Sequence, residues 1–212
     1  MRKNGRLLIV AGSDSGGGAG IQADIKTCTA LGGFAMTAVT ALTAQNTEGV
    51  HGVHPVPPGF IADQMRVVLR DIGADAVKTG MLHDAEVIEA VAETLEREAP
   101  GARPSSSAAG WPSWAALGVK AVLLKDGHGE GAVVRDRLLE PSGETVFEHE
   151  RLDTRHTHGT GCTLASAAAT GLSQGLDLVA AMRRAGDFVH EAIRTAPGLG
   201  RGHGPLNHRP PV

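Results

Sequence analysis

The fold is decided by the stretch LLIVAGSDSGGGAG, which occupies Leu7–Gly20. Its apolar half belongs to a run from Gly5 to Ala11 that predicts a buried strand, and the glycines that follow predict a loop. Apolar residues then recur with helical spacing from Ile21 to Leu31. A strand that passes through a glycine-rich loop into a helix indicates the start of an α/β unit, and α/β proteins bind ligands at such strand ends.

The rest of the chain alternates between strand and helix patterns. Strands are predicted at Phe34–Thr43, Val50–Val56, Ala74–Lys78 and Val119–Leu124, with a hairpin formed by Gly131–Leu138 and Thr145–His149. Helices are predicted from Pro58 onward and at Ala85–Arg97, Thr160–Ser173 and Leu178–Thr195. Such alternation predicts an α/β fold with a mostly parallel sheet covered on both faces.

The alternation breaks at an irregular junction between Ala99 and Trp114. This segment is rich in proline, glycine and serine and shows neither helical nor strand periodicity, so we interpret it as a linker. The whole chain has 212 residues, of which 42% are apolar and 20% charged, which suits a single domain over residues 1–212.

The composition excludes several classes of function. The net charge is −3, from 20 basic and 23 acidic residues without a basic block, so we expect no general binding of nucleic acid. The two cysteines have no paired spacing for zinc or a disulfide framework, which indicates a reducing compartment. No apolar run approaches 18 residues and no signal sequence is evident, so we expect a cytoplasmic protein that does not enter a membrane.

The candidate catalytic loop is HTHGTGCT at His156–Thr163, directly before a long alanine-rich segment. The unpaired amides of a first helical turn attract phosphate oxygens, and glycines let the backbone approach an anion closely. We expect Thr160 to cap this helix. A cysteine in the first turn, Cys162, is expected to favour its thiolate form and to accept a proton. The alternative is a plain glycine turn before a packed helix, with the cysteine in the core.

Other loops carry polar side chains at predicted strand ends. The loop after Gly12 fits neither a P-loop nor a dinucleotide fingerprint, so we expect a flexible or backbone-donating loop beside Ser13 and Asp14, with Asp24 on the following helix. The alternative is a tight strand-to-helix turn that binds no ligand. Gln45 has a carboxamide that suits the edge of a nitrogen heterocycle, and Met81 can lie on a flat ring. Lys125 can bring an ammonium group near phosphates. The histidines lack the partners of a metal site, so metal ligands are left open.

Taken together, these loops resemble those of the hydroxymethylpyrimidine and phosphomethylpyrimidine kinases of thiamine biosynthesis, which are ribokinase-like enzymes. The resemblance implies a single three-layer α/β/α domain. The motifs that carry it are AGSDSGGGAG at Ala11–Gly20, TAQNT at Thr43–Thr47, KTGM at Lys78–Met81, THGTGCT at Thr157–Thr163 and GHGPLNH at Gly202–His208.

The resemblance also implies a chemistry. Gln45 would bind the aminopyrimidine, in a pocket shaped by Gly12, Ala19 and Met81 together with Asp24. Cys162 would accept the proton when the hydroxyl or phosphate oxygen of the substrate attacks the γ-phosphate of ATP.

Three neighbours of that cysteine, Gly159, Thr160 and Gly161, would stabilise the charge on the transferring phosphoryl group. Thr157 and Lys125 would lie near the nucleotide, whose phosphates Mg²⁺ would bridge. A homodimer is the expected assembly.

The resemblance fails between Arg97 and Val119. There the family has an Asp-Pro-Val-Met strand end and an Asn-x-x-Glu motif, and this chain has neither. We hypothesise that a βαβ-sized segment with central strands of the sheet has been lost, through deletion or a gene-model error. Two alternatives to an active kinase on the pyrimidine therefore stay open, a catalytically impaired pyrimidine-binding remnant and a pyridoxal kinase of the same superfamily.

Overall fold

The computed structural model describes residues 4–100, 103–105, 119–127 and 129–209. It divides the chain, which we expected to form a single domain, into two compact units. The larger unit combines Met1–Ser105 with Thr154–Val212, and the smaller unit is Ser106–Asp153.

The larger unit contains a parallel sheet with the strand order β2-β1-β5-β6. Its register places Leu8 of β1 opposite Met36 of β2 on one side and Val77 of β5 on the other. The predicted α/β fold with a parallel sheet is confirmed. The strands are β1 (Arg6–Ala11), β2 (Phe34–Val39), β5 (Ala76–Thr79) and β6 (Arg103–Ser105).

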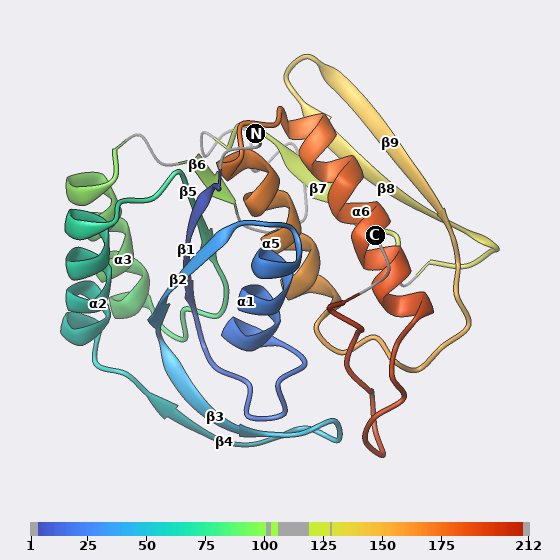
Figure 1. The fold of residues 1–212 in the computed structure, drawn as a ribbon, viewed down its shortest axis with the longest axis horizontal. Coiled ribbons are helices and arrows are strands. Elements are labelled where there is room, and N and C mark those ends of the chain that lie inside the picture. The colour runs from blue at the N-terminus through green and yellow to red at the C-terminus, as the bar shows by residue number, and fades with distance from the viewer. Residues whose placement is uncertain (1–3, 101–102, 106–118, 128, 210–212) are drawn as a thin grey trace. The chain divides into compact units, whose positions relative to one another are not determined.

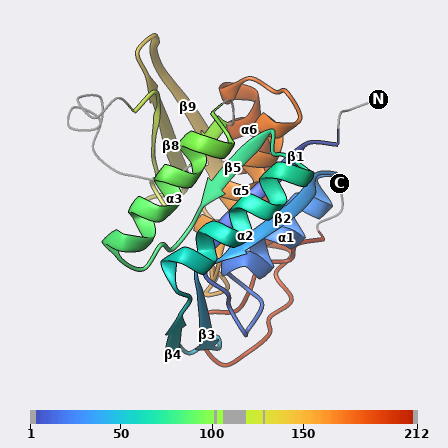
Figure 2. The same cartoon turned by 90° about the vertical axis from the view of Figure 1, so that its left-hand side faces the viewer.

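Helices cover both faces of this sheet, as Figures 1 and 2 show. Side chains alternate between the faces along β1, so Leu8 and Val10 join one core cluster while Leu7 and Ile9 join another. The first cluster lies under α2 (Pro58–Asp71) and α3 (Ala85–Glu98). The second lies under α1 (Gly20–Ala30) and α5 (Thr160–Ser173), and α6 (Leu178–Arg194) packs on α5.

The strand predicted at Phe34–Thr43 is wrong as a single element. The structure breaks it at Thr40, whose backbone N–H donates to the Ala11 carbonyl and whose hydroxyl donates to the Met81 carbonyl. After this break the chain leaves the sheet and forms an antiparallel ribbon of β3 (Ala41–Gln45) and β4 (Val50–Pro55). The break carries the end of β3 toward the glycine-rich loop.

The prediction of an unstructured linker is wrong at Arg103–Ser105, which pairs in parallel with β5 as strand β6. Periodicity could not reveal a strand of three residues. The rest of the predicted linker, from residue 106 onward, lies outside the described residues.

The smaller unit is an antiparallel sheet in the order β7-β8-β9. It comprises β7 (Val122–Leu124), β8 (Val133–Glu140) and β9 (Gly143–Glu150), and the predicted hairpin is confirmed. Nowhere in the described ranges does a helix have the length and apolarity needed to cross a membrane.

Candidate functional site

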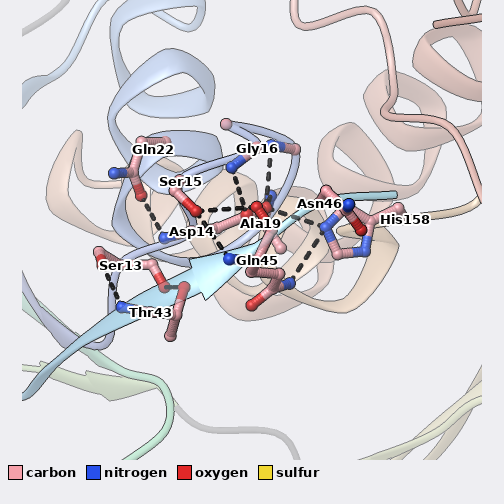
Figure 3. Close-up of polar contacts among 12 residues, drawn as sticks. Ser13, Asp14, Ser15, Gly16, Ala19, Gln22, Thr43, Gln45, Asn46 and His158 are labelled. Carbon is pink, nitrogen blue, oxygen red and sulfur yellow. Dashed lines mark hydrogen bonds and ion pairs between the residues drawn. The ribbon is translucent and has the colours of Figure 1, made fainter. Parts of the chain in front are cut away.

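The glycine-rich loop is folded around the carboxylate of Asp14, which is only 1% exposed. One carboxylate oxygen accepts the backbone N–H of Gly16 at 2.8 Å. The other accepts the N–H groups of Gly18 at 3.0 Å and of Ala19 at 2.7 Å. Figure 3 shows Gly16 and Ala19 around this carboxylate. An aspartate that bonds the amides following it is a common turn device, and here it holds the loop closed at the start of α1.

The environment of Asp14 keeps its side chain ionised. Burial alone would raise the pKa of this carboxyl group, but the hydrogen bonds from His158, Ala19 and Gly16 together outweigh burial and lower the pKa below its usual value. A negative charge is therefore fixed in the loop next to the end of β3.

Gln45 is attached to the same loop through its backbone. The Ser15 hydroxyl donates to the Gln45 carbonyl at 2.8 Å and accepts the Gln45 N–H at 2.7 Å, as Figure 3 shows. Ser13 and Thr43 form a second pair of bonds between loop and ribbon. The register of the ribbon shifts between Ala44 and Gln45, and such a bulge redirects a side chain. The main chain of Gln45 is thus fixed while its carboxamide extends beyond the strand.

The loop before α5 packs directly on the glycine-rich loop. Gly159 is the N-cap in a left-handed conformation, with φ of 86°, and a Cβ there would lie 1.8 Å from the Gly18 carbonyl oxygen. Only glycine fits this contact. The predicted N-cap, Thr160, is wrong because the helix begins at that residue, whose hydroxyl donates back to the Thr157 carbonyl.

His158 joins the two loops through one ring nitrogen. Its Nε2 lies 2.9 Å from Asp14 Oδ2 and 3.3 Å from Gln45 Nε2 (Figure 3). The side chain remains 22% exposed. Through this contact the structure brings Gln45 next to the loop that leads into Cys162, although more than a hundred residues separate them.

Cys162 lies in the first turn of α5 and is partly exposed. The first intrahelical bond runs from Thr163 N–H to the Gly159 carbonyl, so the amides of Gly161 and Cys162 have no acceptor inside the helix. A Cβ on Gly161 would meet no atom of the described residues within 4 Å. Among the described residues, none covers Gly161, and the free amides and the partly exposed thiol lie together at this helix start.

Two of the residues expected around a substrate are in contact. A Cβ on Gly12 would lie 2.7 Å from the Met81 terminal methyl group, so the methionine lies across the glycine. Met81 is 45% exposed. Ala19 is the N-cap residue of α1 and donates its N–H to Asp14, so its backbone is part of the loop framework.

The structure argues against the predicted contact of Asp24 with a substrate. This carboxylate is 0% exposed, and both of its oxygens are bonded, one to the Lys78 ammonium at 2.7 Å and the other to the Ser166 hydroxyl at 2.7 Å. Lys78 is itself only 2% exposed. A carboxylate closed in this way joins β5, α1 and α5 and leaves no oxygen for a ligand.

Thr157 and Lys125, the two residues expected near a nucleotide, lie in different units. Thr157 is exposed before α5, where its carbonyl accepts two bonds from Thr160. Lys125 is exposed in the smaller unit. The neighbouring Asp126 forms an ion pair with Arg151 at 3.3 Å, so its charge is compensated within that unit.

The C-terminal tail contacts both the turn of the ribbon and the first turn of α5. Its residues Gly202 and His203 donate backbone N–H groups to Thr47 in the turn of the ribbon. His208 lies 3.1 Å from the Thr163 hydroxyl and is buried. Burial, together with the charge of Lys26, lowers the pKa of His208 to about 4, so this imidazole is neutral at physiological pH.

Sequence reasoning missed the roles of Asp14 and His158. The sequence offered one indication for each residue. Asp14 precedes a run of small residues that favours a turn, and His158 directly precedes Gly159, the glycine that packs against the other loop. Their pairing across 144 positions was not predictable from either motif alone.

The described residues do not fit a metal centre built from side chains. Within the placed parts of the chain, no group of three or more His, Cys, Asp or Glu side chains is arranged to hold an ion. We therefore assign no ligand for Mg²⁺.

Comparison with known proteins shows a family match over most of the chain. The model of the family described as phosphomethylpyrimidine kinase matches residues 14–103 and 108–207. The thiamine biosynthesis bifunctional protein of Geobacter sulfurreducens is 42% identical over 96% of this chain, which spans about half (52%) of that relative. The hydroxymethylpyrimidine/phosphomethylpyrimidine kinase of Streptomyces coelicolor is 41% identical over 95% of this chain and 93% of its own length.

Solved structures with the same fold include two kinases. The ADP complex of pyridoxal kinase from Bacillus subtilis superposes with a TM-score of 0.84 at 29% identity, covering 96% of this chain and 97% of that one. The phosphomethylpyrimidine kinase of Clostridium difficile has a TM-score of 0.71 at 29% identity, covering 89% and 99%. The ribokinase-like architecture expected from the sequence is confirmed.

The alignments also reveal a gap in this chain. The alignment with the Streptomyces coelicolor relative runs over 252 positions but includes only 95% of the 212 residues, so about 50 positions of the relative have no counterpart. The family match is interrupted between residues 103 and 108, a stretch that includes the last two residues of β6. The irregular composition found in the sequence thus coincides with the interruption.

Proposed function

Because the chain belongs to the phosphomethylpyrimidine kinase family, a family of phosphotransferases, we propose that it phosphorylates 4-amino-5-hydroxymethyl-2-methylpyrimidine and its monophosphate with ATP in thiamine biosynthesis. The observation that supports the proposal is the contact of Gln45 with His158, a residue of the loop that leads into α5 and Cys162. A substrate held at Gln45 would present its hydroxyl group toward that helix start.

The chemistry assigned to the chain is a proton transfer and charge stabilisation. The Cys162 thiolate takes the proton of the substrate hydroxyl while the oxygen forms a bond to the γ-phosphorus of ATP and the bond to the leaving ADP oxygen breaks. The amides of Gly161 and Cys162 stabilise the negative charge on the transferring group. A second ATP then phosphorylates the monophosphate in the same way. In this family Mg²⁺ is expected on the nucleotide, where it would neutralise part of the charge of the phosphates.

The test is ADP release upon addition of the pyrimidine, measured with the protein and with two cysteine variants. Cys162→Ala should reduce kcat by about 10²- to 10⁴-fold, the usual contribution of a general base. Cys28→Ala removes the other thiol, which is buried in the core, and should retain turnover per folded molecule. Full turnover in Cys162→Ala would reject the assignment of the base.

A second candidate is a pyrimidine-binding remnant without kinase activity, and the gap of about 50 positions favours it. Calorimetry with each ligand separates the two proposals. Saturable binding of the pyrimidine without binding of ATP supports the remnant, whereas binding of both supports the kinase. Sequencing the gene and its transcript tests whether the gap belongs to the natural protein.

A pyridoxal kinase activity is the third candidate, favoured by the structural likeness to that enzyme of Bacillus subtilis. Comparing kcat/KM for pyridoxal and for the pyrimidine decides between them, and we expect the higher value for the pyrimidine because the curated relatives are named for it.

The proposal includes a cytoplasmic location and a homodimer. Cell fractionation and sedimentation of the purified chain test these two statements.

A further inference from the structure

We propose that His158 is a positioning residue that fixes which end of the Gln45 carboxamide faces the substrate. The inference rests on the proposed function, because it concerns how the same site recognises its heterocycle. It gives His158 a role that acts through Gln45 and not on the reacting atoms.

The ring nitrogen of His158 that faces Asp14 carries a hydrogen. Its Nε2 is 2.9 Å from Asp14 Oδ2, an oxygen that also accepts the amides of Gly18 and Ala19. An ionised carboxylate only accepts hydrogen bonds, so Nε2 must carry a hydrogen and donate it. This holds for the neutral ring with its proton on Nε2 and for the charged ring alike.

One end of the Gln45 carboxamide faces the same nitrogen. A ring nitrogen that carries a hydrogen has no lone pair in the ring plane and cannot accept from an amide NH₂ group. The carboxamide atom 3.3 Å from Nε2 is therefore the carbonyl oxygen, since the two ends of a carboxamide are distinguished by their partners. Nε2–H is then shared between Asp14 and Gln45, and the NH₂ group of Gln45 points away from His158.

The side chain of Gln45 can rotate although its main chain is held. The backbone of Gln45 is fixed on both sides by the Ser15 hydroxyl, so only the side-chain torsions can exchange the two ends of the amide. His158 supplies the bond that favours one of these orientations. Asp14 in turn holds His158, and four protein donors keep that carboxylate in place.

The consequence is a preference for one kind of heterocycle edge. An amide that offers its NH₂ group to the ligand selects an unprotonated ring nitrogen, as in a 4-aminopyrimidine. The 4-oxo analogue carries a hydrogen on that nitrogen, so it cannot accept a hydrogen bond from the NH₂ group of the amide. Without His158 the amide can turn over and present its oxygen to the analogue, so we expect discrimination between the two ligands to fall.

The experiment compares the dissociation constants of 4-amino-5-hydroxymethyl-2-methylpyrimidine and its 4-oxo analogue. His158→Leu should reduce their ratio by about tenfold, the equivalent of one hydrogen bond, whereas His158→Gln keeps a donor and should retain most of it. His203→Leu removes another loop histidine, bonded to the Arg155 carbonyl, and should leave the ratio unchanged. A merely structural role would weaken both ligands equally, and an unchanged ratio in His158→Leu overturns the inference.

Two further measurements keep the inference separate from the proposed function. In Gln45→Ala the added effect of His158→Leu on the ratio should vanish, and a persisting effect would contradict action through Gln45. Nitrogen NMR of the ligand-free protein should show His158 Nε2 protonated and the Gln45 NH₂ signals displaced in His158→Leu. A ring protonated on Nδ1 alone overturns the inference, whereas failure of the wild type to bind the pyrimidine overturns the proposed function instead.

Discussion

Two acid–base pairs in the larger unit each join segments that are far apart in the sequence, and they differ in what surrounds them. Asp24 and Lys78 are buried between α1, β5 and α5, and Ser166 bonds the remaining carboxylate oxygen. Asp14 and His158 also join segments far apart in sequence, but the imidazole is 22% exposed and reaches Gln45. The first pair is closed on all sides, while the second has one side open to a ligand.

Burial decides what such a pair can do. Desolvation raises the pKa of the Asp24 carboxyl group despite the opposing effects of Lys78 and Ser166. Burying the charges of this closed pair therefore costs free energy that their attraction only partly offsets. For Asp14 the hydrogen bonds exceed the effect of burial and lower the pKa. A closed pair holds elements in register, whereas a pair with one accessible member can orient a neighbour in a site.

The largest expected effect is on the closed pair. Lys78→Met leaves the Asp24 charge buried without its partner and should cost about 3–5 kcal/mol of unfolding free energy, measured by urea denaturation. The double variant Asp24→Leu with Lys78→Met removes both charges and should recover much of that loss. A small loss of unfolding free energy in Lys78→Met would show that solvent reaches the pair.

A second test uses His208, buried behind the α5 start. Its pKa is lowered from 6.5 to about 4, so on acidification the unfolded chain binds a proton before the folded protein does. The contribution of neutral His208 to the unfolding free energy is therefore complete above pH 6.5. The unfolding free energy should fall by about 3 kcal/mol as the pH decreases to 4.

The measurement is urea denaturation at several pH values between 7 and 4. His208→Asn should flatten the profile in this window, and His203→Asn serves as its control because that histidine is exposed. Equal pH profiles for the protein and His208→Asn would contradict a buried neutral imidazole.

A third test addresses the open pair. Asp14→Asn removes a charged acceptor of backbone amides and should cost roughly 1.5–3 kcal/mol at pH 7. Because the folded pKa of Asp14 is lowered, its contribution is present above the ordinary aspartate pKa of about 4 and is lost as the pH falls further. The difference between variant and protein should therefore shrink only in that acidic range, and a constant difference throughout would argue against ionised Asp14.

The smallest effect is expected at an exposed pair in the smaller unit. Arg137 contacts Glu144 across the β8–β9 hairpin at 2.6 Å, with both side chains in contact with solvent. Arg137→Ala should leave the urea midpoint of unfolding nearly unchanged, because water and salt screen such pairs. A loss of stability comparable with that of Lys78→Met would show that burial does not determine how much an ion pair contributes to stability.

Much of the fold was predictable because it is encoded locally. The helix at Thr160–Ser173 and the hairpin of the smaller unit agree with their sequence patterns, since periodicity and turn residues act over short distances. The strand β6 was missed because three residues carry no period, and the strand at Phe34–Thr43 was wrong because Thr40 bonds to distant carbonyls.

The candidate site was predictable as a set of motifs and not as an arrangement. Gln45 and Cys162 were selected by the chemistry of their side chains, which the sequence states directly. The burial of Asp24 was not predictable, because nothing in its own helix indicates that Lys78 and Ser166 come from other elements to enclose it.

Patterns along the chain were therefore enough to predict the α/β class, the family and the residue types at the loops, because these depend on neighbouring residues. Which polar residues are buried and which remain accessible depends on how distant segments pack in the folded protein. Burial and hydrogen-bond partners arise from contacts between distant segments, and such contacts exist only after folding. The contact between Asp14 and His158, which are 144 positions apart, is one example.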